Sequence, residues 1–359
     1  MAQTAETLDR FDLGTNVRED LSDVIYNISP TEVPAQSNFG RGTAEQTFKE
    51  WQIDELRAAA NNAAIDGDEF AGDPLNDADR IGNYLQISRE DIVVSRRANI
   101  VNKAGRKSEV AYQIAKAGKA LRRDVEFAIC ARKIAVAGNS TTASESAGIP
   151  AWIRTNLVRP TGGTAPTLSG TTEGFPNGIG TDPGDTNKDR ALDESEILQV
   201  IRECYDEGGN PNVIMLNTRS KQGLSNFLFS STSTRIATQY QDQGANPRSG
   251  ISVVGAVDVY VTDFGVLDIV PNRFMPQYSV TAPGTDAGQG DGVDIGAECF
   301  ILDTEYWEVA YLDGYKVETI AKIGDHERRM LLVDWTLCSL NQAASGLVAD
   351  FNDATDVIA

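Results

Sequence analysis

Residues 89–133 read "REDIVVSRRANIVNKAGRKSEVAYQIAKAGKALRRDVEFAICARK", and this segment decides the fold that we expect. Six of its apolar residues are spaced three or four positions apart, which places them on one face of a helix: Val110, Ile114, Ala117, Leu121, Val125 and Ala128. The chain has no proline between Lys103 and Gly138. The sequence therefore predicts one long helix over residues 103–138, about 54 Å in length at a rise of about 1.5 Å per residue.

The same segment is strongly basic in a chain that is acidic overall. Residues 89–133 hold 12 Lys or Arg against 5 Asp or Glu, a local charge of +7, whereas the whole chain has 32 basic and 52 acidic residues and a net charge of −20. Residues 1–88 carry 17 acidic and 6 basic side chains, a charge of −11. Tight binding to nucleic acid needs clustered cations that release counterions from phosphates, so this chain is a poor candidate for direct nucleic-acid recognition.

Length and composition favour two or three packed lobes. The chain has 359 residues, and 41% of them are apolar, which supports sizeable cores. Its first 20 residues contain no apolar core of a signal peptide, and no run approaches 18 consecutive apolar residues, so we expect neither a secretion signal nor a membrane partner. The four cysteines form no CxxC pair, and we expect buried thiols at Cys130, Cys204, Cys299 and Cys338.

Two extended features are expected in the first hundred residues. Residues 1–36 are polar with little apolar periodicity, which predicts an arm that lies on another surface. The runs "FKEWQIDEL" (48–56) and "RIGNYLQISREDIVVS" (80–95) alternate as strands do, and the stretch between them is rich in Ala, Asn, Asp and Gly. This pattern predicts a long β-hairpin that projects from the body.

The second half of the chain predicts a mixed α/β lobe followed by returning strands. Asp193 and Glu196 form a capping box ahead of a helix, "NVIMLN" (212–217) reads as a buried strand, and residues 257–274 read as a hairpin. Strand-rich runs continue from residue 298, and the tail after Gly346 is expected to fray. The predicted fold class is α+β.

No segment carries a recognisable catalytic motif. The chain lacks GxGxxG, P-loop, HExxH and GxSxG motifs, and its only histidine, His326, has no nucleophile elbow or glycine loop beside it. The segment "DTNKDRALDESE" (185–196) approaches a calcium loop, but Arg190 stands where the turn needs glycine, and Asp193 is fully explained as a helix cap. We therefore expect no enzyme, no cofactor and no metal site, with calcium binding as a remote alternative.

Several blocks of the sequence occur in an order that is similar to one protein family. Together they resemble the major capsid (major head) proteins of tailed bacteriophages with the Hong Kong 97-type fold. The resemblance covers most of the chain and fades in 138–190, 276–297 and the tail. The blocks are "REDLSDVIYNISPTEVP" (18–34), "SNFGRG" (37–42), "EWQIDEL" (50–56), "NKAGRKSEVAYQIAKAGKALRRDVE" (102–126), "VDVYVTDFGVLDIVPNRF" (257–274), "EYWEVAYL" (305–312), "GDHERRMLLVDWTL" (324–337) and "ASG" (344–346).

The resemblance implies an α+β, Hong Kong 97-like capsid fold and a role for each part of the chain. The implied parts are an N-terminal arm (1–36), an extended β-hairpin loop (37–96), a peripheral domain (97–156) with a spine helix at 103–138, an axial α/β domain (157–297), return strands of the peripheral domain (298–335), and an axial-domain strand with the C-terminal tail (336–359).

The resemblance also implies a function. The chain would be a structural subunit of an icosahedral or prolate phage head, assembling with itself into pentamers and hexamers that enclose double-stranded DNA without sequence-specific binding. A portal protein is an implied partner, and scaffold and decoration proteins remain open. Its place would be the virion, after assembly in the bacterial host cytoplasm. An encapsulin-like nanocompartment shell is the alternative, and an acidic calcium-binding surface protein is the remote one.

The charge pattern suggests how subunits meet. We expect acidic arm or loop surfaces of one subunit to contact the basic segment of another, because complementary charge sets register and encounter rate. A solvated helix face explains the same charges and stays open as an alternative. The candidate contact residues are Arg96, Arg97, Lys103, Arg106, Lys107, Arg122, Arg123, Glu50, Trp51 and Asp54.

Overall fold

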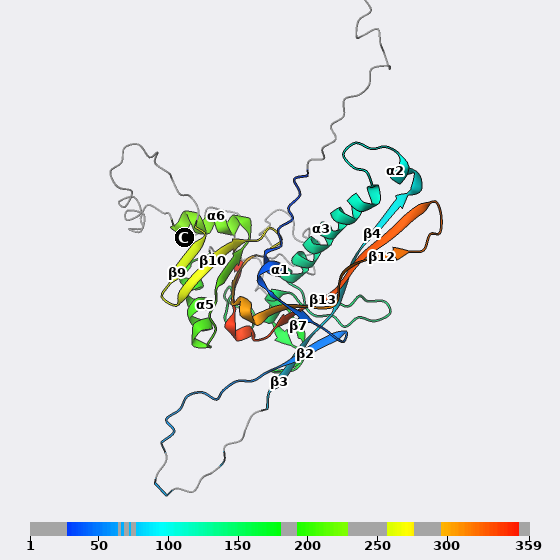
Figure 1. The fold of residues 1–359 in the computed structure, drawn as a ribbon. Helices are drawn as coiled ribbons and strands as arrows, with labels where there is room; N and C mark the ends of the chain where they lie inside the picture. Colours follow the sequence, from blue (N-terminus) through cyan, green and yellow to red (C-terminus); the bar gives the residue numbers. More distant parts are fainter. Residues whose placement is uncertain are drawn as a thin grey trace, which may run out of the picture.

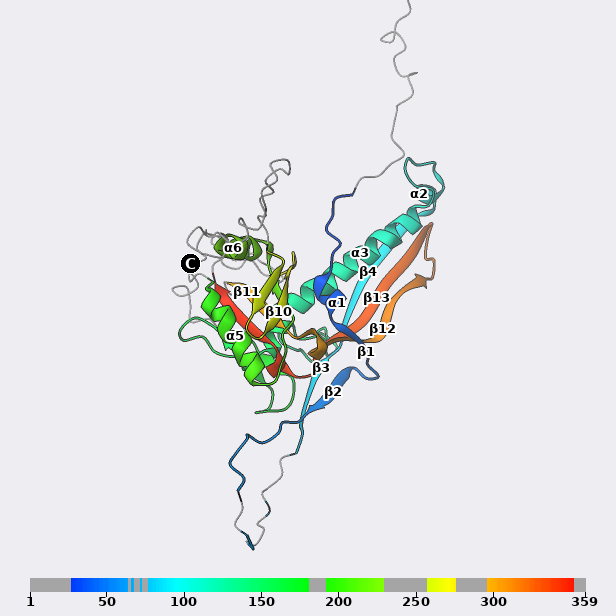
Figure 2. The same ribbon diagram turned by 60° about the vertical axis from the view of Figure 1, so that its left-hand side comes forward.

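The body of the protein consists of two sheets and the helices that pack on them. The computed structural model describes residues 27–63, 66–67, 72, 77–180, 192–228, 257–275 and 296–351. In this part of the chain, a long four-stranded sheet carries one long helix, and a six-stranded sheet is flanked by shorter helices (Figure 1). A two-stranded hairpin projects away from both sheets (Figure 2). The predicted α+β class is confirmed.

The four-stranded sheet, called here the long sheet, has the order β1–β12–β13–β4. Its two central strands are each 14 residues long and antiparallel, and β1 runs parallel to β12. The sequence turns sharply at 321–325 between β12 and β13, as expected for successive antiparallel strands. The strands are β1 (Gly40–Thr43), β4 (Gln86–Ser95), β12 (Trp307–Ile320) and β13 (His326–Ser339).

The long helix α3 spans Glu109–Cys130, so the predicted helix 103–138 was wrong at both ends. At the start, Gly105 has a φ of +76°, outside helical geometry, and the Ser108 hydroxyl then accepts a hydrogen bond from the Ala111 amide as the N-cap. The basic residues before that turn belong to a separate short helix, α2 (Arg96–Ile100).

The end of α3 is set by a tertiary contact. Ala131 turns to an extended conformation, with φ −70° and ψ 145°, and its carbonyl comes up against Gly148. A Cβ at Gly148 would lie only 2.0 Å from that carbonyl oxygen, so the chain can end the helix here only beside a glycine. This contact lies outside any local sequence pattern.

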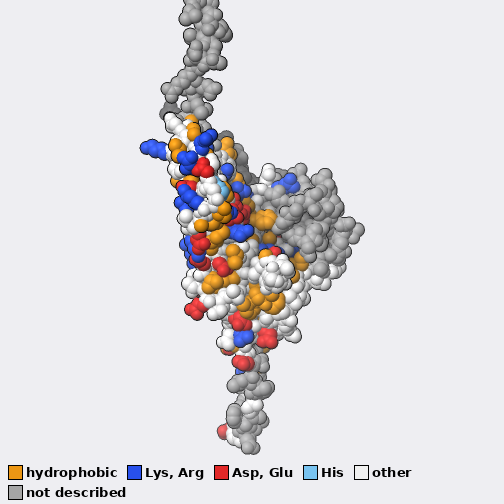
Figure 3. All heavy atoms as spheres, turned by 90° about the vertical axis from the view of Figure 1, so that its right-hand side faces the viewer, with side chains coloured by type: hydrophobic (Ala, Val, Ile, Leu, Met, Phe, Trp, Pro, Cys, Tyr) orange, Lys and Arg blue, Asp and Glu red, His pale blue; other side chains and the backbone are white. Residues whose placement is uncertain are grey.

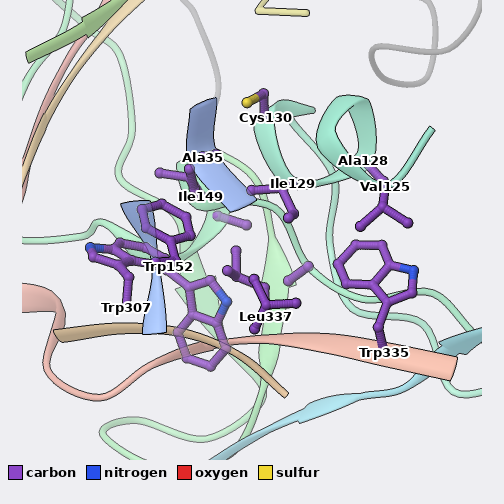
Figure 4. Close-up of a cluster of buried hydrophobic side chains, with 14 of the residues drawn as sticks. Ala35, Val125, Ala128, Ile129, Cys130, Ile149, Trp152, Trp307, Trp335 and Leu337 are labelled. Carbon is purple, nitrogen blue, oxygen red and sulfur yellow. The ribbon is translucent and has the colours of Figure 1, made fainter. Parts of the chain in front are cut away.

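The predicted apolar stripe of α3 packs on the long sheet. Val110, Ala117, Leu121, Val125 and Ala128 are buried, whereas Ile114 is half-buried. Figure 4 shows Val125 and Ala128 close to Trp335 of β13, with Ile129, Ile149, Trp152, Trp307 and Leu337 continuing the same core. Three fully buried tryptophans make this junction the largest apolar mass of the fold.

The six-stranded sheet has the order β5–β14–β11–β8–β10–β9. Helix α5 (Glu194–Asp206) packs on it through Ile197, Val200, Ile201 and Cys204, and the Asp193 carboxylate accepts the Ser195 amide as the predicted cap. Helix α6 (Thr218–Leu228) lies beside β10. The strands are β5 (Leu157–Val158), β8 (Val213–Leu216), β9 (Val259–Thr262), β10 (Gly265–Pro271), β11 (Ala297–Leu302) and β14 (Gly346–Phe351).

The expectation of a frayed tail after Gly346 was wrong for residues 347–351, whereas residues 352–359 lie outside the described part of the chain. Residues 346–351 form β14, which is buried along its whole length between β5 and β11. Gly346 lies so close to Val200 and Cys204 of α5 that a side chain there would clash. The last described residues therefore belong to the core of this sheet.

The structure contains the base of the predicted hairpin, but the predicted strand at 80–95 forms two separate strands. β2 (Phe48–Ile53) pairs with β3 (Asp79–Tyr84), whereas β4, which begins one residue after Leu85, pairs with β13 of the long sheet. Leu85 is buried at this switch. The remaining short elements are α1 (Pro34–Asn38), α4 (Ile149–Trp152), β6 (Thr167–Leu168), β7 (Pro176–Gly178) and two 3-10 helices, η2 (Thr304–Tyr306) and η3 (Gln342–Ala344).

The four cysteines are free and buried, as expected. Among the described residues, no helix is long and apolar enough to span a membrane, and no group of His, Cys, Asp or Glu is arranged to hold a metal ion. The proposed calcium-loop positions Asp185, Asn187 and Asp189 lie outside the described residues.

Candidate inter-subunit interface

The basic residues around α2 do not form one uniform patch. Arg96 pairs with Asp325 at 2.6 Å, but both side chains are more than 60% exposed, so water screens the pair strongly. Arg97 and Lys107 are exposed. Figure 3 shows the Lys and Arg side chains of this region interspersed with acidic and hydrophobic ones.

The side chains of Lys103 and Arg106 form hydrogen bonds within their own subunit, at the end of α2 and the start of α3. Lys103 Nζ donates to the Ala98 and Asn99 carbonyls at the end of α2, and Arg106 Nε donates to Glu109 in the first turn of α3. Hydrogen bonds from Gln113 and Arg106 lower the pKa of the Glu109 carboxyl. Both cations line a hollow of about 850 Å³ between α2, β4 and α3. Their positions are set within the subunit before any partner arrives.

Arg122 and Arg123 are consecutive in the sequence but lie on different sides of α3. The exposed Arg122 guanidinium lies over the ring of Tyr315, 5.6 Å from its centroid, next to β12. Arg123 is half-buried and lies over Phe274, also at 5.6 Å, beside the loop after β10. Such cation–π contacts hold each side chain in place. Arg122 thus faces solvent beside the long sheet. Arg123 instead connects α3 to the loop that follows β10 of the six-stranded sheet.

The three candidates on the hairpin have different surroundings. Glu50 pairs with Arg80 across β2 and β3 at 3.0 Å. Trp51 Nε1 donates to the Ser339 carbonyl at 2.9 Å, and its ring lies 5.4 Å from that of Trp152, so Trp51 anchors the hairpin to the body. Asp54, just beyond β2, is exposed and accepts a hydrogen bond from the Glu55 amide. Among these three, Asp54 has the free surface that a neighbour could contact.

A junction that the sequence did not reveal forms around Glu126 on α3. Its carboxylate accepts the Ala35 and Gln36 amides at 2.7 and 3.1 Å, and the Asn272 side-chain amide at 2.8 Å. Burial raises the pKa of this carboxyl, although those hydrogen bonds oppose the shift. One side chain therefore fixes α1, α3 and the loop after β10 relative to one another.

A second junction consists of four buried charges. Arg132 and Arg159 both contact Asp350 at 2.7 Å, and Arg132 Nε lies 3.9 Å from Glu298. Burial, opposed by Arg132, raises the pKa of Glu298 to about 7. Arg132 follows α3, Arg159 lies in the loop after β5, Glu298 lies in β11 and Asp350 lies in β14. No local sequence pattern could therefore have indicated that these four residues meet.

A smaller hollow, which no sequence pattern indicated, lies between α3 and β12. It measures about 310 Å³ and has an apolar floor of Ile114, Leu121, Val317 and Leu331. Lys119, Arg122 and Lys316 line its edge. This feature is called the α3–β12 hollow below. An apolar floor with a cationic edge can receive an amphipathic acidic segment.

The arrangement of these parts is shared with solved capsid structures. A structure from Gordonia phage Cozz has a TM-score of 0.54 at 12% identity, over 98% of this chain and 96% of that one. One from Mycobacterium phage Bobi has a TM-score of 0.55 at 12% identity, covering 96% and 98%. The capsid of a native GTA particle, described with C5 symmetry, has a TM-score of 0.54 at 13% identity, covering 94% and 96%. The fold is the Hong Kong 97-like fold of capsid subunits, as the sequence resemblance implied.

The sequence comparisons identify the family of capsid proteins to which the chain belongs. The model of the SU10 major capsid protein family matches residues 3–352, so the chain belongs to this family. The major capsid protein of Escherichia phage Phieco32 is 24% identical over 360 residues, which is 89% of this chain and 90% of that protein. The chain is a structural subunit of the capsid shell and part of the virion. This favours the phage capsid over the encapsulin-like shell and the calcium-binding surface protein.

Proposed function

We propose that the subunit assembles with itself into pentamers and hexamers, in which the acidic loop beyond β2 of one subunit contacts the basic α2–α3 region of another. The observation that carries this proposal is the exposure of residues 54–63 along their whole length, with Leu56 99% exposed. An extended segment without packing in its own chain can be ordered by a neighbouring subunit. The C5 symmetry described for the GTA capsid supports fivefold assembly of this fold.

Charge supports the same contact. Residues 54–79 hold 8 acidic and 1 basic side chain, a charge of −7, against +7 for residues 89–133. Opposite charges on two surfaces of one chain steer a second copy into register and increase the rate of encounter. Of the predicted contact residues, Asp54, Arg97, Lys107 and Arg122 are exposed and available for this role.

We also propose that the shell encloses double-stranded DNA. A net charge of −20 disfavours tight binding of the wall to phosphates, so a genome could enter and leave. A portal protein would occupy one vertex, and scaffold or decoration proteins would be further partners. Assembly would take place in the host cytoplasm, and the subunit would have no enzymatic activity. The division into arm, extended loop, peripheral and axial domains belongs to the same proposal.

Electron microscopy of the purified full chain, with light scattering on the same sample, tests the proposal. We expect closed shells, or pentamers and hexamers when a scaffold is missing. Shells that contain DNA when isolated from infected cells would support the phage head, whereas a co-purifying enzyme would favour a nanocompartment. A monodisperse monomer at high concentration, with the loop at 54–63 protected from proteases, would contradict the proposal.

A further inference from the structure

A pocket of about 300 Å³ lies where α1 and β1 meet α3 and β12. Figure 2 shows α1 beside α3 and β1 beside β12, so one subunit supplies all of its walls. The volume is at the lower end of the range typical of small-molecule sites. The polar side chains of its lining belong to Gln36, Ser37, Arg41, Arg122, Tyr311 and Tyr315, and it is called here the tyrosine pocket.

Two cations of the tyrosine pocket lack an acidic partner. Within the described residues, neither Arg41 of β1 nor Arg122 of α3 forms an ion pair, and no carboxylate lines the pocket. Both guanidinium groups act electrostatically on the hydroxyls of Tyr311 and Tyr315, so the two charges surround the same pair of rings. The lining therefore carries two positive charges and no negative one.

Glu126 of α3 does not supply the missing counter-ion. Its charge acts on both tyrosine hydroxyls, but its side chain does not line the pocket. Its carboxylate oxygens accept hydrogen bonds from the Ala35 and Gln36 amides and from the side chain of Asn272. The carboxylate is thus directed toward α1 and the loop after β10, and the two arginines of the pocket stay available to a ligand.

The walls of the tyrosine pocket are held in place by bonds within the subunit. The Tyr315 hydroxyl donates to Gln36 Oε1 at 3.1 Å, and Gln36 Nε2 donates to the Arg122 carbonyl at 2.8 Å. The Arg122 guanidinium lies over the Tyr315 ring, 5.6 Å from its centroid. Burial raises the pKa of the Tyr311 and Tyr315 hydroxyls, so both stay uncharged at neutral pH and neither repels an anion. A site that is already ordered loses little entropy when a ligand binds.

We propose that the tyrosine pocket binds a phosphate-type dianion between Arg41 and Arg122, with the Tyr311 hydroxyl as a further donor. Two guanidinium groups match the two charges of a phosphate and form charge-assisted hydrogen bonds with its oxygens. A phosphate within a DNA backbone carries a single charge, so free phosphate or a phosphomonoester is the better match. The bound dianion would join β1 to α3 and β12. This site needs one subunit only and goes beyond the proposed assembly.

Isothermal titration of unassembled full-length subunits with inorganic phosphate tests the site. Chloride holds the ionic strength constant, so that screening does not change during the titration. We expect one phosphate per subunit, and sulfate, a dianion of the same shape, should compete with it. Arg41→Gln should weaken binding by about tenfold or more, because it removes charge-assisted hydrogen bonds. Arg41 is the better target because Arg122 is also a candidate contact residue.

The matched control is Arg89→Gln, which removes an exposed arginine on β4 that does not line the pocket. Its phosphate affinity should equal that of the wild type. Phosphate should also raise the melting temperature of the wild type and of Arg89→Gln, but not that of Arg41→Gln. Tyr311→Phe removes a single oxygen from the lining and should weaken phosphate binding several-fold. Equal melting of all four proteins without phosphate would show that the variants fold.

Three outcomes would overturn the proposed dianion site. The first is a wild type that does not bind phosphate, and the second is equal phosphate affinity in Arg41→Gln and Arg89→Gln. The third is Arg41-dependent binding of a short DNA duplex without terminal phosphates, in place of inorganic phosphate, which would assign the pocket to backbone phosphates. Each of these results leaves the proposed self-assembly intact, because the titration uses unassembled subunits.

Discussion

Arg132 and Asp350 lie 218 residues apart in the sequence, yet Arg132 Nη1 donates a hydrogen bond to Asp350 Oδ1 at 2.7 Å inside the protein. Arg159 Nη1 reaches the other carboxylate oxygen at 2.7 Å, and all three side chains are at most 4% exposed. Asp350 has a φ of 58°, in the left-handed region that few side chains tolerate. A single carboxylate therefore joins β14 to the end of α3 and to the loop after β5.

Removing this carboxylate charge should strongly destabilise the subunit. In Asp350→Asn, the asparagine tolerates the left-handed backbone, so the change isolates the charge. Two buried guanidinium groups would lose their counter-ion, a change that typically costs about 3–5 kcal/mol of unfolding free energy. Urea unfolding of unassembled subunits, followed by tryptophan fluorescence, measures the loss.

The matched control is Asp325→Asn, which removes the partner of Arg96. That pair is exposed on both sides, so solvent already screens it and the unfolding midpoint should hardly move. Equal effects of the two Asp→Asn changes would contradict the role of the buried cluster.

The neighbouring carboxyl of Glu298 should make stability depend on pH. Burial raises its pKa from 4.5 to about 7, so the folded protein binds this proton more tightly than the unfolded chain does. The stabilisation is fully present below about pH 4.5 and is lost as pH rises through about 7. Glu298→Gln keeps the shape of the protonated side chain and removes the titration.

The measurement compares unfolding free energies of wild type and Glu298→Gln between pH 4.5 and 8. We expect the wild type to lose up to a few kcal/mol relative to the variant as pH rises across this interval. A difference between the two proteins that stays constant with pH would show that Glu298 keeps one protonation state throughout.

The centre of α3 could be predicted from the sequence because helical periodicity is local. Val110, Ala117 and Leu121 are buried where the pattern placed them. The ends of the helix could not be predicted in the same way. The end at Cys130 depends on Gly148, which leaves room for the Ala131 carbonyl, and only the folded chain brings these residues together.

The C-terminal strand β14 and the exposure of the basic residues on α3 could not be predicted from the sequence for a related reason. "GLVADF" is short, contains an acid and lies near the end of the chain, so its burial as β14 depends on β5, β11 and the two arginines around Asp350. The sequence marked Arg122 and Arg123 as one basic pair, but their side chains lie on different sides of α3. Charge density in a sequence does not say which cations remain exposed after folding.

Glu126 should hold α1 in place against α3. Glu126→Gln replaces one of the two carboxylate oxygens with an NH₂ group, which cannot accept a hydrogen bond, and it removes the negative charge toward which the Ala35 and Gln36 amides both donate. Hydrogen bonds to charged groups contribute about 1.5–3 kcal/mol, so amide exchange at residues 35 and 36 should accelerate by roughly one to two orders of magnitude. Asp124→Asn, an exposed neighbour on α3, is the control and should leave that exchange unchanged.

Charge reversal at the two adjacent arginines should separate assembly from folding. Arg122→Glu changes an exposed cation at the edge of the α3–β12 hollow, so it should slow assembly and weaken its salt dependence while the subunit melts normally. Arg123→Glu instead loses the contact with Phe274 and places a half-buried acid on α3, so its main effect should be a lower melting temperature. Light scattering at several salt concentrations, with thermal melting of unassembled subunits, measures both effects. If Arg122→Glu assembled with the salt dependence of the wild type, the basic edge of the hollow would have no part in subunit contact.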